Sequence, residues 1–144
     1  MHSIDILFIE DNPHDAEMAL SVLKEHKVTH KILVLKDGAA ALDFLFGPEA
    51  SAEQRQSPFP KLILLDLKLP KVNGLEILKK IKSAERTRSI PVIILSSSNE
   101  ERDRIECYAH GANSYIVKPV DFEHFSRAIV EIGHYWIKLN RPYY

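Results

Sequence analysis

Acidic residues stand directly after two short apolar segments of this sequence. Glu10 and Asp11 follow segment 4–9, and Asp66 follows segment 62–65. Three carboxylates brought close together repel one another and raise one another's pKa unless a cation neutralises them. A hard divalent ion such as Mg²⁺ takes carboxylate, carbonyl and water oxygens as ligands. These residue types predict a Mg²⁺ site, provided that the fold brings the two segment ends together.

A hydroxyl group and a lysine follow two further apolar segments. Ser96 comes directly after segment 92–95, and Lys118 follows segment 115–117. A lysine and a hydroxyl beside a bound cation complement the charge and the oxygens of a phosphoryl group. A carboxylate can itself be the nucleophile in phosphoryl transfer. Together these side chains predict a pocket that places a phosphoryl group on Asp66.

The apolar segments indicate the fold that must position these side chains. Each is short, rich in Ile, Val and Leu, and without alternation, which is typical of strands buried on both faces of a parallel sheet. Helix-like segments lie between them, and this order predicts a doubly wound α/β fold with a five-stranded parallel sheet and helices on both faces. In such a sheet, ligands bind beyond the carboxyl ends of the strands, where the candidate residues stand. The expected strands are 4–9, 32–35, 62–65, 92–95 and 115–117, and the expected helices are 15–26, 38–46, 73–85, 99–110 and 121–139.

Composition limits the class of protein. The 144 residues suit one domain, 1–144, interrupted only by a surface loop at 47–60. Nineteen basic against 20 acidic side chains give a net charge of -1, which argues against a nucleic-acid or membrane-surface binder. The single cysteine suits a reducing compartment. Because no apolar run approaches the ~18 residues of a membrane span and no signal peptide opens the chain, we expect a cytoplasmic protein.

Several of these motifs together resemble a known family. In their order and at their strand ends, they are similar to the signature of bacterial response-regulator receiver domains, and the resemblance covers about residues 4–139. It implies the flavodoxin-like strand order 2-1-3-4-5. Segment 112–115, the loop at 47–60 and the late Trp136 more narrowly resemble the small single-domain regulators that partner phytochrome-type histidine kinases. The residues that carry the family resemblance are Glu10, Asp11, Asp66, Asn73, Gly74, Ser96, Tyr115, Lys118 and Pro119.

The resemblance implies a role for each site residue. Asp66 is expected to be the phosphoacceptor and, with Asp11, a direct ligand of Mg²⁺. The backbone carbonyl of Lys68 would be a third protein ligand, and Glu10 would act mainly through bound water. Lys118 would pair with the phosphoryl oxygens, and the hydroxyl group of the serine at position 96 would bond to one of them.

A conformational change is also implied. Ser96 is expected to move toward the phosphoryl group and Tyr115 to turn inward, and the Lys118–Pro119 peptide bond is expected to be cis. The change would alter the face made by helix 99–110, strand 115–117 and helix 121–139. A symmetric homodimer is expected through this face, with Tyr135, Ile137 and tail 141–144 contributing side chains of a type enriched at interfaces.

The function implied is that of a single-domain response regulator of a two-component system. It would accept a phosphoryl group from a sensor histidine kinase and signal through protein contacts. It would not be an enzyme beyond self-phosphorylation and slow autodephosphorylation. A phosphorelay intermediate and a phosphorylation-independent interaction module remain alternatives. A flavodoxin-like electron carrier is disfavoured because acidic residues stand where its phosphate-binding loop would be, and a dinucleotide-binding domain because its glycine fingerprint is missing.

Some residues also have a structural interpretation. Ser98, with Glu101 three residues later, resembles a capping box, so we assign helix capping to Ser98 and phosphate contact to the serine two positions earlier. Cys107 is interpreted as a small hydrophobic residue of its helix. The aromatic residues of helix 121–139 are expected in the core: Phe122, Phe125 and Trp136.

Overall fold

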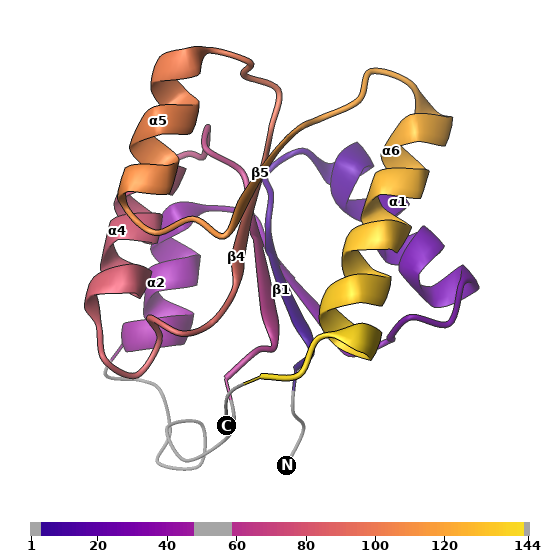
Figure 1. Ribbon diagram of the computed structural model, residues 1–144, viewed down its shortest axis with the longest axis horizontal. Coiled ribbons are helices and arrows are strands. Elements are labelled where there is room, and N and C mark those ends of the chain that lie inside the picture. Colours follow the sequence, from indigo (N-terminus) through magenta and orange to yellow (C-terminus); the bar gives the residue numbers. More distant parts are fainter. Residues whose placement is uncertain (1–3, 48–58, 143–144) are drawn as a thin grey trace.

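A single parallel sheet forms the centre of the protein (Figure 1). The computed structural model describes residues 4–47 and 59–142, so nearly all of the expected loop 47–60 lies outside the described residues. The strand order is β2-β1-β3-β4-β5 with every neighbouring pair parallel, which confirms the predicted sheet and its order. The strands are β1 (Ile6–Ile9), β2 (Ile32–Leu35), β3 (Leu62–Leu65), β4 (Val92–Ser96) and β5 (Ser114–Val117).

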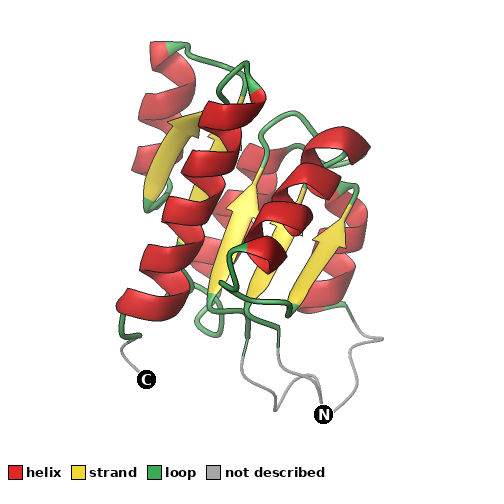
Figure 2. Ribbon diagram, turned by 90° about the vertical axis from the view of Figure 1, so that its right-hand side faces the viewer, coloured by secondary structure: helices red, strands yellow, loops and turns green. Residues whose placement is uncertain are grey.

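Helices cover both faces of this sheet. Figure 1 shows α2, α4 and α5 on one face and α1 and α6 on the other, and Figure 2 gives the same layers from the side. The predicted helix 121–139 is α-helical only in its first part and continues as the π-helical segment η1. The helices of the described residues are α1 (Pro13–Glu25), α2 (Gly38–Phe46), α4 (Gly74–Ser83), α5 (Glu101–Ala109), α6 (Phe122–Gly133) and η1 (His134–Leu139).

The two helical layers explain why β1 is apolar throughout. In β1, Leu7 and Ile9 join the core on the α2–α4–α5 side, whereas Ile6 and Phe8 join the core on the α1–α6 side. Successive side chains of a strand point to opposite faces. Because both faces are covered, all four positions are buried and no polar residue alternates with them.

Polar residues start the helices at the carboxyl edge of the sheet. The Asn12 side chain accepts hydrogen bonds from the backbone N–H groups of His14 and Asp15 at 2.9 and 3.2 Å, and Pro13 is the first residue of α1. Such a cap satisfies amide groups that have no partner within the helix. This capping fixes the position of the first turn of α1 beside the end of β1.

The expected cap of α5 is wrong. The helix begins at Glu101 and the Glu100 side chain makes no capping bond. The Ser98 hydroxyl accepts from the backbone N–H of Glu100 and donates to the Asp103 carboxylate, so it closes a turn ahead of the helix. The capping-box pattern misleads here because the turn after β4 is longer than the motif assumes.

The aromatic and cysteine expectations have mixed outcomes. Phe125 is buried and Trp136 packs against the α1–α6 core, but Phe122 is 59% exposed, so its assignment to the core is wrong. Phe122 is the first residue of α6, and it stands ahead of the part of the helix that faces the sheet. Cys107 is buried as predicted, and burial raises the pKa of its thiol to about 11.

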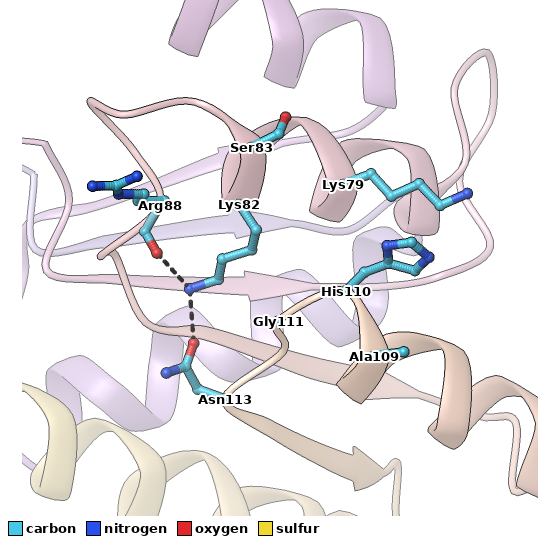
Figure 3. Close-up of a pocket in the computed structure, with 8 residues that line it drawn as sticks. All are labelled: Lys79, Lys82, Ser83, Arg88, Ala109, His110, Gly111 and Asn113. Carbon is cyan, nitrogen blue, oxygen red and sulfur yellow. Dashed lines mark hydrogen bonds between the residues drawn. The ribbon is translucent and has the colours of Figure 1, made fainter.

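A cavity of about 620 Å³ lies between the carboxyl-terminal ends of α4 and α5 (Figure 3). The Lys82 ammonium points toward Arg88 and Asn113 (Figure 3) and donates to the carbonyls of Arg88 and Ile90 and to the Asn113 side chain, at 3.0, 2.7 and 3.0 Å. An ammonium group has three donors, and these contacts use all of them. Lys82 therefore links α4 to the segments that lead into β4 and β5. This structural role accounts for a lysine at this position without a ligand in the pocket.

Candidate functional site

The carboxyl ends of the central strands bring the three predicted acidic residues together. In the parallel pair of β1 and β3, Ile9 lies opposite Leu65, so Glu10 and Asp66 are the next residues of adjacent strands. Together with Asp11, each offers a carboxylate oxygen that lies within 4.8 Å of the other two. This separation, and the all-oxygen donor set, fit a single hard divalent ion.

Lys118 supplies the positive charge of the site. It follows β5, and its backbone N–H donates to the carbonyl of the last β4 residue, Ser96, at 2.7 Å. Its Nζ lies 2.6 Å from Glu10 Oε1, 3.0 Å from Asp15 Oδ2 and 3.4 Å from Asp66 Oδ2. Burial alone would lower the pKa of Lys118, but the bonds to Glu10 and Asp15 and the charge of Asp66 raise it above its usual range. Lys118 is therefore a permanent cation at the acidic cluster.

Glu10 is the most deeply placed carboxylate of the cluster. Its side chain is fully buried, and its Oε2 accepts the backbone N–H of Asn12 at 3.1 Å. Burial and the nearby charge of Asp66 raise its pKa, while the bond to Lys118 lowers it, and the balance raises the pKa of Glu10 to about 7. Desolvation disfavours the charged form of a carboxylic acid, so a bound cation would stabilise the ionised form of Glu10.

Ser96, the last residue of β4, and Tyr115 on β5 both form hydrogen bonds with Ser98 in the turn after β4. The buried Ser96 hydroxyl accepts the backbone N–H of Ser98 at 3.1 Å. The Tyr115 hydroxyl donates to the Ser98 carbonyl at 2.9 Å, and burial raises its pKa. Among the described residues, no hydrogen bond joins Ser96 to Asp66, so the predicted contact of this serine with a phosphoryl group stays a prediction.

Two further expectations concern backbone groups near Asp66 and Lys118. The backbone N–H of Lys68 donates to Asp66 Oδ1 at 3.2 Å, whereas the role of its carbonyl group as a metal ligand stays a prediction. The expected cis bond between Lys118 and Pro119 is wrong, because the described residues contain no cis peptide bond. A trans bond is the more stable form even before proline, and in this form Lys118 already reaches its three carboxylates.

Asp15 is a site residue that the sequence reasoning missed. It lies in the first turn of α1 and contacts Lys118, 103 residues later in the chain. Its one signal in the sequence is its position four residues after Asp11, at the start of the expected helix 15–26. That spacing also occurs in helices with no functional site, so it could not single out Asp15.

Comparison with known proteins identifies the family of this arrangement. Residues 6–130 match the model of the response regulator receiver domain. The chain belongs to this family. It is a receiver-domain response regulator of a two-component system, and the family consists of signalling phosphoacceptors rather than enzymes in the usual sense.

Relatives of similar length support this assignment. The probable methanogenesis regulatory protein FilR2 of Methanothrix harundinacea is 40% identical over 94% of this chain and 85% of its own length. The response regulator Rcp1 of Synechocystis is 36% identical over 92% and 88%, and its Mn²⁺-bound crystal structure superposes with a TM-score of 0.85 over 96% and 98% of the two chains, at 34% identity. The phosphorylated cyanobacterial phytochrome response regulator RcpA is 31% identical over the whole of both chains, with a TM-score of 0.87. In the described part of the chain, no helix is long and apolar enough to span a membrane.

Proposed function

We propose that Asp66 is the phosphoacceptor of this response regulator. The observation that carries the proposal is the position of its carboxylate: Asp66 is only 6% exposed, belongs to the acidic cluster and has the Lys118 ammonium 3.4 Å away. An Asp66 oxygen would attack the phosphorus of a phosphohistidine, the P–N bond would break, and the imidazole would leave. Lys118 stands where it can balance the charge of the transferred phosphoryl oxygens, and the hydroxyl group of Ser96 would donate to one of them.

Mg²⁺ is the ion that we propose for the acidic cluster. Asp11 and Asp66 would bind it directly with the Lys68 carbonyl, and Glu10 would act through a bound water molecule. Such an ion would neutralise the carboxylates and the phosphoryl oxygens, so that the negatively charged phosphoryl group could approach the negatively charged Asp66. The Mn²⁺-bound structure of the relative Rcp1 supports a divalent ion in this family.

The affinity for Mg²⁺ is expected to rise with pH up to about 7 and then level off. Because the pKa of Glu10 is raised to about 7, its carboxyl group holds a proton below that pH which the ion must displace. Release of one proton on binding gives a rise of about tenfold per pH unit below the pKa. Titration calorimetry from roughly pH 5.5 to 8.5, a range that spans the raised pKa of this carboxyl group, measures how the Mg²⁺ affinity depends on pH.

Glu10→Gln is the control for this pH dependence. Since glutamine does not titrate, the variant is expected to bind Mg²⁺ more weakly but with a flatter pH profile. A wild-type affinity that is constant across the range would contradict the assignment of the proton to Glu10.

We infer that the partner is a sensor histidine kinase, and that it is of the phytochrome type. The name of RcpA as a phytochrome response regulator supports the choice. Val120 and Phe122 are strongly exposed beside Lys118 and offer apolar surface next to the site for a docking protein. We also infer that residues 1–144 act as one receiver domain in the cytoplasm, with no catalysis beyond self-phosphorylation and slow autodephosphorylation, and that nucleic acid is not a partner.

Direct phosphorylation tests the proposed function. The protein is incubated with acetyl phosphate, or with a phosphorylated histidine kinase, in the presence of Mg²⁺ or of EDTA. We expect an acid-stable, base-labile adduct with Mg²⁺ and none with EDTA, because an acyl phosphate has this lability. A protein that remains unlabelled by both donors would favour the alternative of a phosphorylation-independent interaction module.

Phosphorylation is expected to promote a homodimer through α5, β5 and α6. β5 is the edge strand of the sheet, and exposed apolar side chains on the flanking helices include Ile105 and Tyr108 on α5 and Tyr135 on η1. Tyr115 links this face to the site through its bond in the turn after β4, whereas Tyr143 and Tyr144 of the expected tail lie outside the described residues.

Sedimentation velocity at tens of micromolar measures this association. With beryllofluoride as a phosphate mimic, the wild type is expected to dimerise, Ile105→Glu to remain monomeric, and Tyr115→Ala to lose the dependence on the mimic. Ile105 is 59% exposed, so this substitution disturbs no core contact. A wild type that is monomeric with and without the mimic would end the dimer proposal.

A further inference from the structure

The Lys118 ammonium is shared by three carboxylates, and one of them has no part in the proposed metal site. Glu10 and Asp66 belong to the acidic cluster with Asp11, but Asp15 approaches Lys118 from α1. The Lys118 side chain is only 12% exposed, so its three N–H donors depend on these protein oxygens rather than on water. Among the described residues, Asp15 is thus the one anionic partner of Lys118 outside the cluster.

An ion bound in the acidic cluster changes which carboxylate oxygens can accept hydrogen bonds from the Lys118 ammonium. A dication close to the ammonium repels it, and carboxylate oxygens that face the ion are no longer free to accept from the lysine. Asp66 would be in that position as a direct ligand and Glu10 through the bound water, whereas Asp15 Oδ2, 3.0 Å from Nζ, is not part of the cluster. Asp15 can therefore keep the ammonium in the site when the other two partners are engaged.

We propose that Asp15 is a positioning residue, which holds the Lys118 ammonium beside Asp66 while the acidic cluster binds its divalent ion. The inference rests on the proposed function, since it assumes that the cluster binds Mg²⁺ and that Lys118 serves the phosphoryl group. In this arrangement Asp66 turns from the lysine to the ion, Glu10 turns to the ion's bound water, and Asp15 keeps its contact with the lysine throughout.

A purely structural role for Asp15 makes different predictions. An acidic residue in the first turn of a helix interacts favourably with the helix dipole, and its removal would weaken α1 whatever Lys118 does. A negative charge near a cation site also strengthens cation binding at a distance, again without the lysine. A test must therefore measure the effect of Asp15 with and without Lys118.

A double-mutant cycle on Mg²⁺ affinity makes this separation. Calorimetry compares wild type, Asp15→Asn, Lys118→Gln and the double variant, with Glu17→Gln as the control that removes one exposed charge from the same helix. In Asp15→Asn the Lys118 ammonium must pair with the metal-binding carboxylates and so competes with the ion for them. We therefore expect the Mg²⁺ affinity to fall by about fivefold. In the Lys118→Gln background, the same substitution is expected to change the affinity by less than about twofold. An equal loss in both backgrounds would overturn the proposal.

The ammonium group itself gives a second measurement that does not need the Lys118 variants. Nitrogen-15 NMR detects a lysine ammonium whose protons are held by protein acceptors and exchange slowly with water. We expect a Lys118 ammonium signal in the wild type with and without Mg²⁺, and in Asp15→Asn only without Mg²⁺. Asp15→Glu, which keeps the carboxylate, is expected to restore the signal in the Mg²⁺-bound protein.

The outcomes also separate this inference from the proposed function. A wild type that binds no Mg²⁺ would refute the proposed metal site. A wild type that binds Mg²⁺, combined with a persistent Lys118 signal in Mg²⁺-bound Asp15→Asn, would overturn the role of Asp15 and leave the phosphoacceptor proposal intact.

Discussion

Asp66→Asn is expected to abolish phosphorylation by acetyl phosphate or by a kinase. The amide oxygen of asparagine is too weak a nucleophile to attack phosphorus, and the substitution also removes one of the three charges of the acidic cluster. The shape of the side chain is kept, and the amide oxygen of the variant could still accept the backbone N–H that Lys68 now donates to Asp66 Oδ1. Intact-mass spectrometry after incubation with the donor and Mg²⁺ should therefore detect no base-labile adduct in a protein that remains folded.

Asp11→Asn is the matched comparison for this loss. Asp11 belongs to the same cluster but is exposed, and its proposed role is to bind the ion. The Asp11→Asn variant should be phosphorylated slowly, and its rate should recover at high Mg²⁺ concentration. No concentration of Mg²⁺ should restore the phosphorylation of Asp66→Asn. A base-labile adduct that forms on Asp66→Asn at the wild-type rate would show that the acceptor lies elsewhere.

The sheet and the acidic cluster could be predicted because they depend on patterns local to each strand. Strands covered on both faces must be apolar at every position, so segments 32–35 and 62–65 coincide with the observed β2 and β3. Parallel strands end at one edge, and this alone brings the residues after them together. Residue type and topology were therefore sufficient to bring Glu10, Asp66 and Lys118 into one site.

Features that depend on how a helix lies on the sheet could not be predicted. The spacing of Ile105 and Ala109 suggests an apolar face, yet both are exposed and only Cys107 of α5 is buried. The contact of Asp15 with Lys118 depends on where the first turn of α1 lies relative to the end of β5, which no local pattern specifies. Phe122 was misplaced for the same reason, since a helical stripe does not show at which residue a helix meets its sheet.

Close packing behind the proposed phosphoacceptor leads to the second large expected effect, that of Gly74→Ala. A Cβ atom on Gly74 would lie 2.2 Å from the Asp66 carbonyl oxygen and 2.7 Å from the Leu67 Cα, and both are backbone atoms that cannot turn aside. The Gly74 N–H also donates to the Leu67 carbonyl at 2.8 Å, which holds the start of α4 against this loop. Relief of the clash must move either α4 or the loop, and overpacking of this kind costs about 1–3 kcal/mol.

Urea unfolding of Gly74→Ala should therefore show a free energy of unfolding lower by about that amount, and phosphorylation should slow because the displaced loop carries Asp66. Ser83→Ala, at the exposed end of the same helix, serves as the control and is expected to change the stability by less than about 0.5 kcal/mol. If Gly74→Ala had wild-type stability and wild-type phosphorylation, the loop at Asp66 and Leu67 would be able to move aside without a loss of free energy of unfolding. In that case the position of the Asp66 carboxylate could not depend on the tight contact between the loop and the first residue of α4, and the pairing of β1 with β3 would be left to fix it.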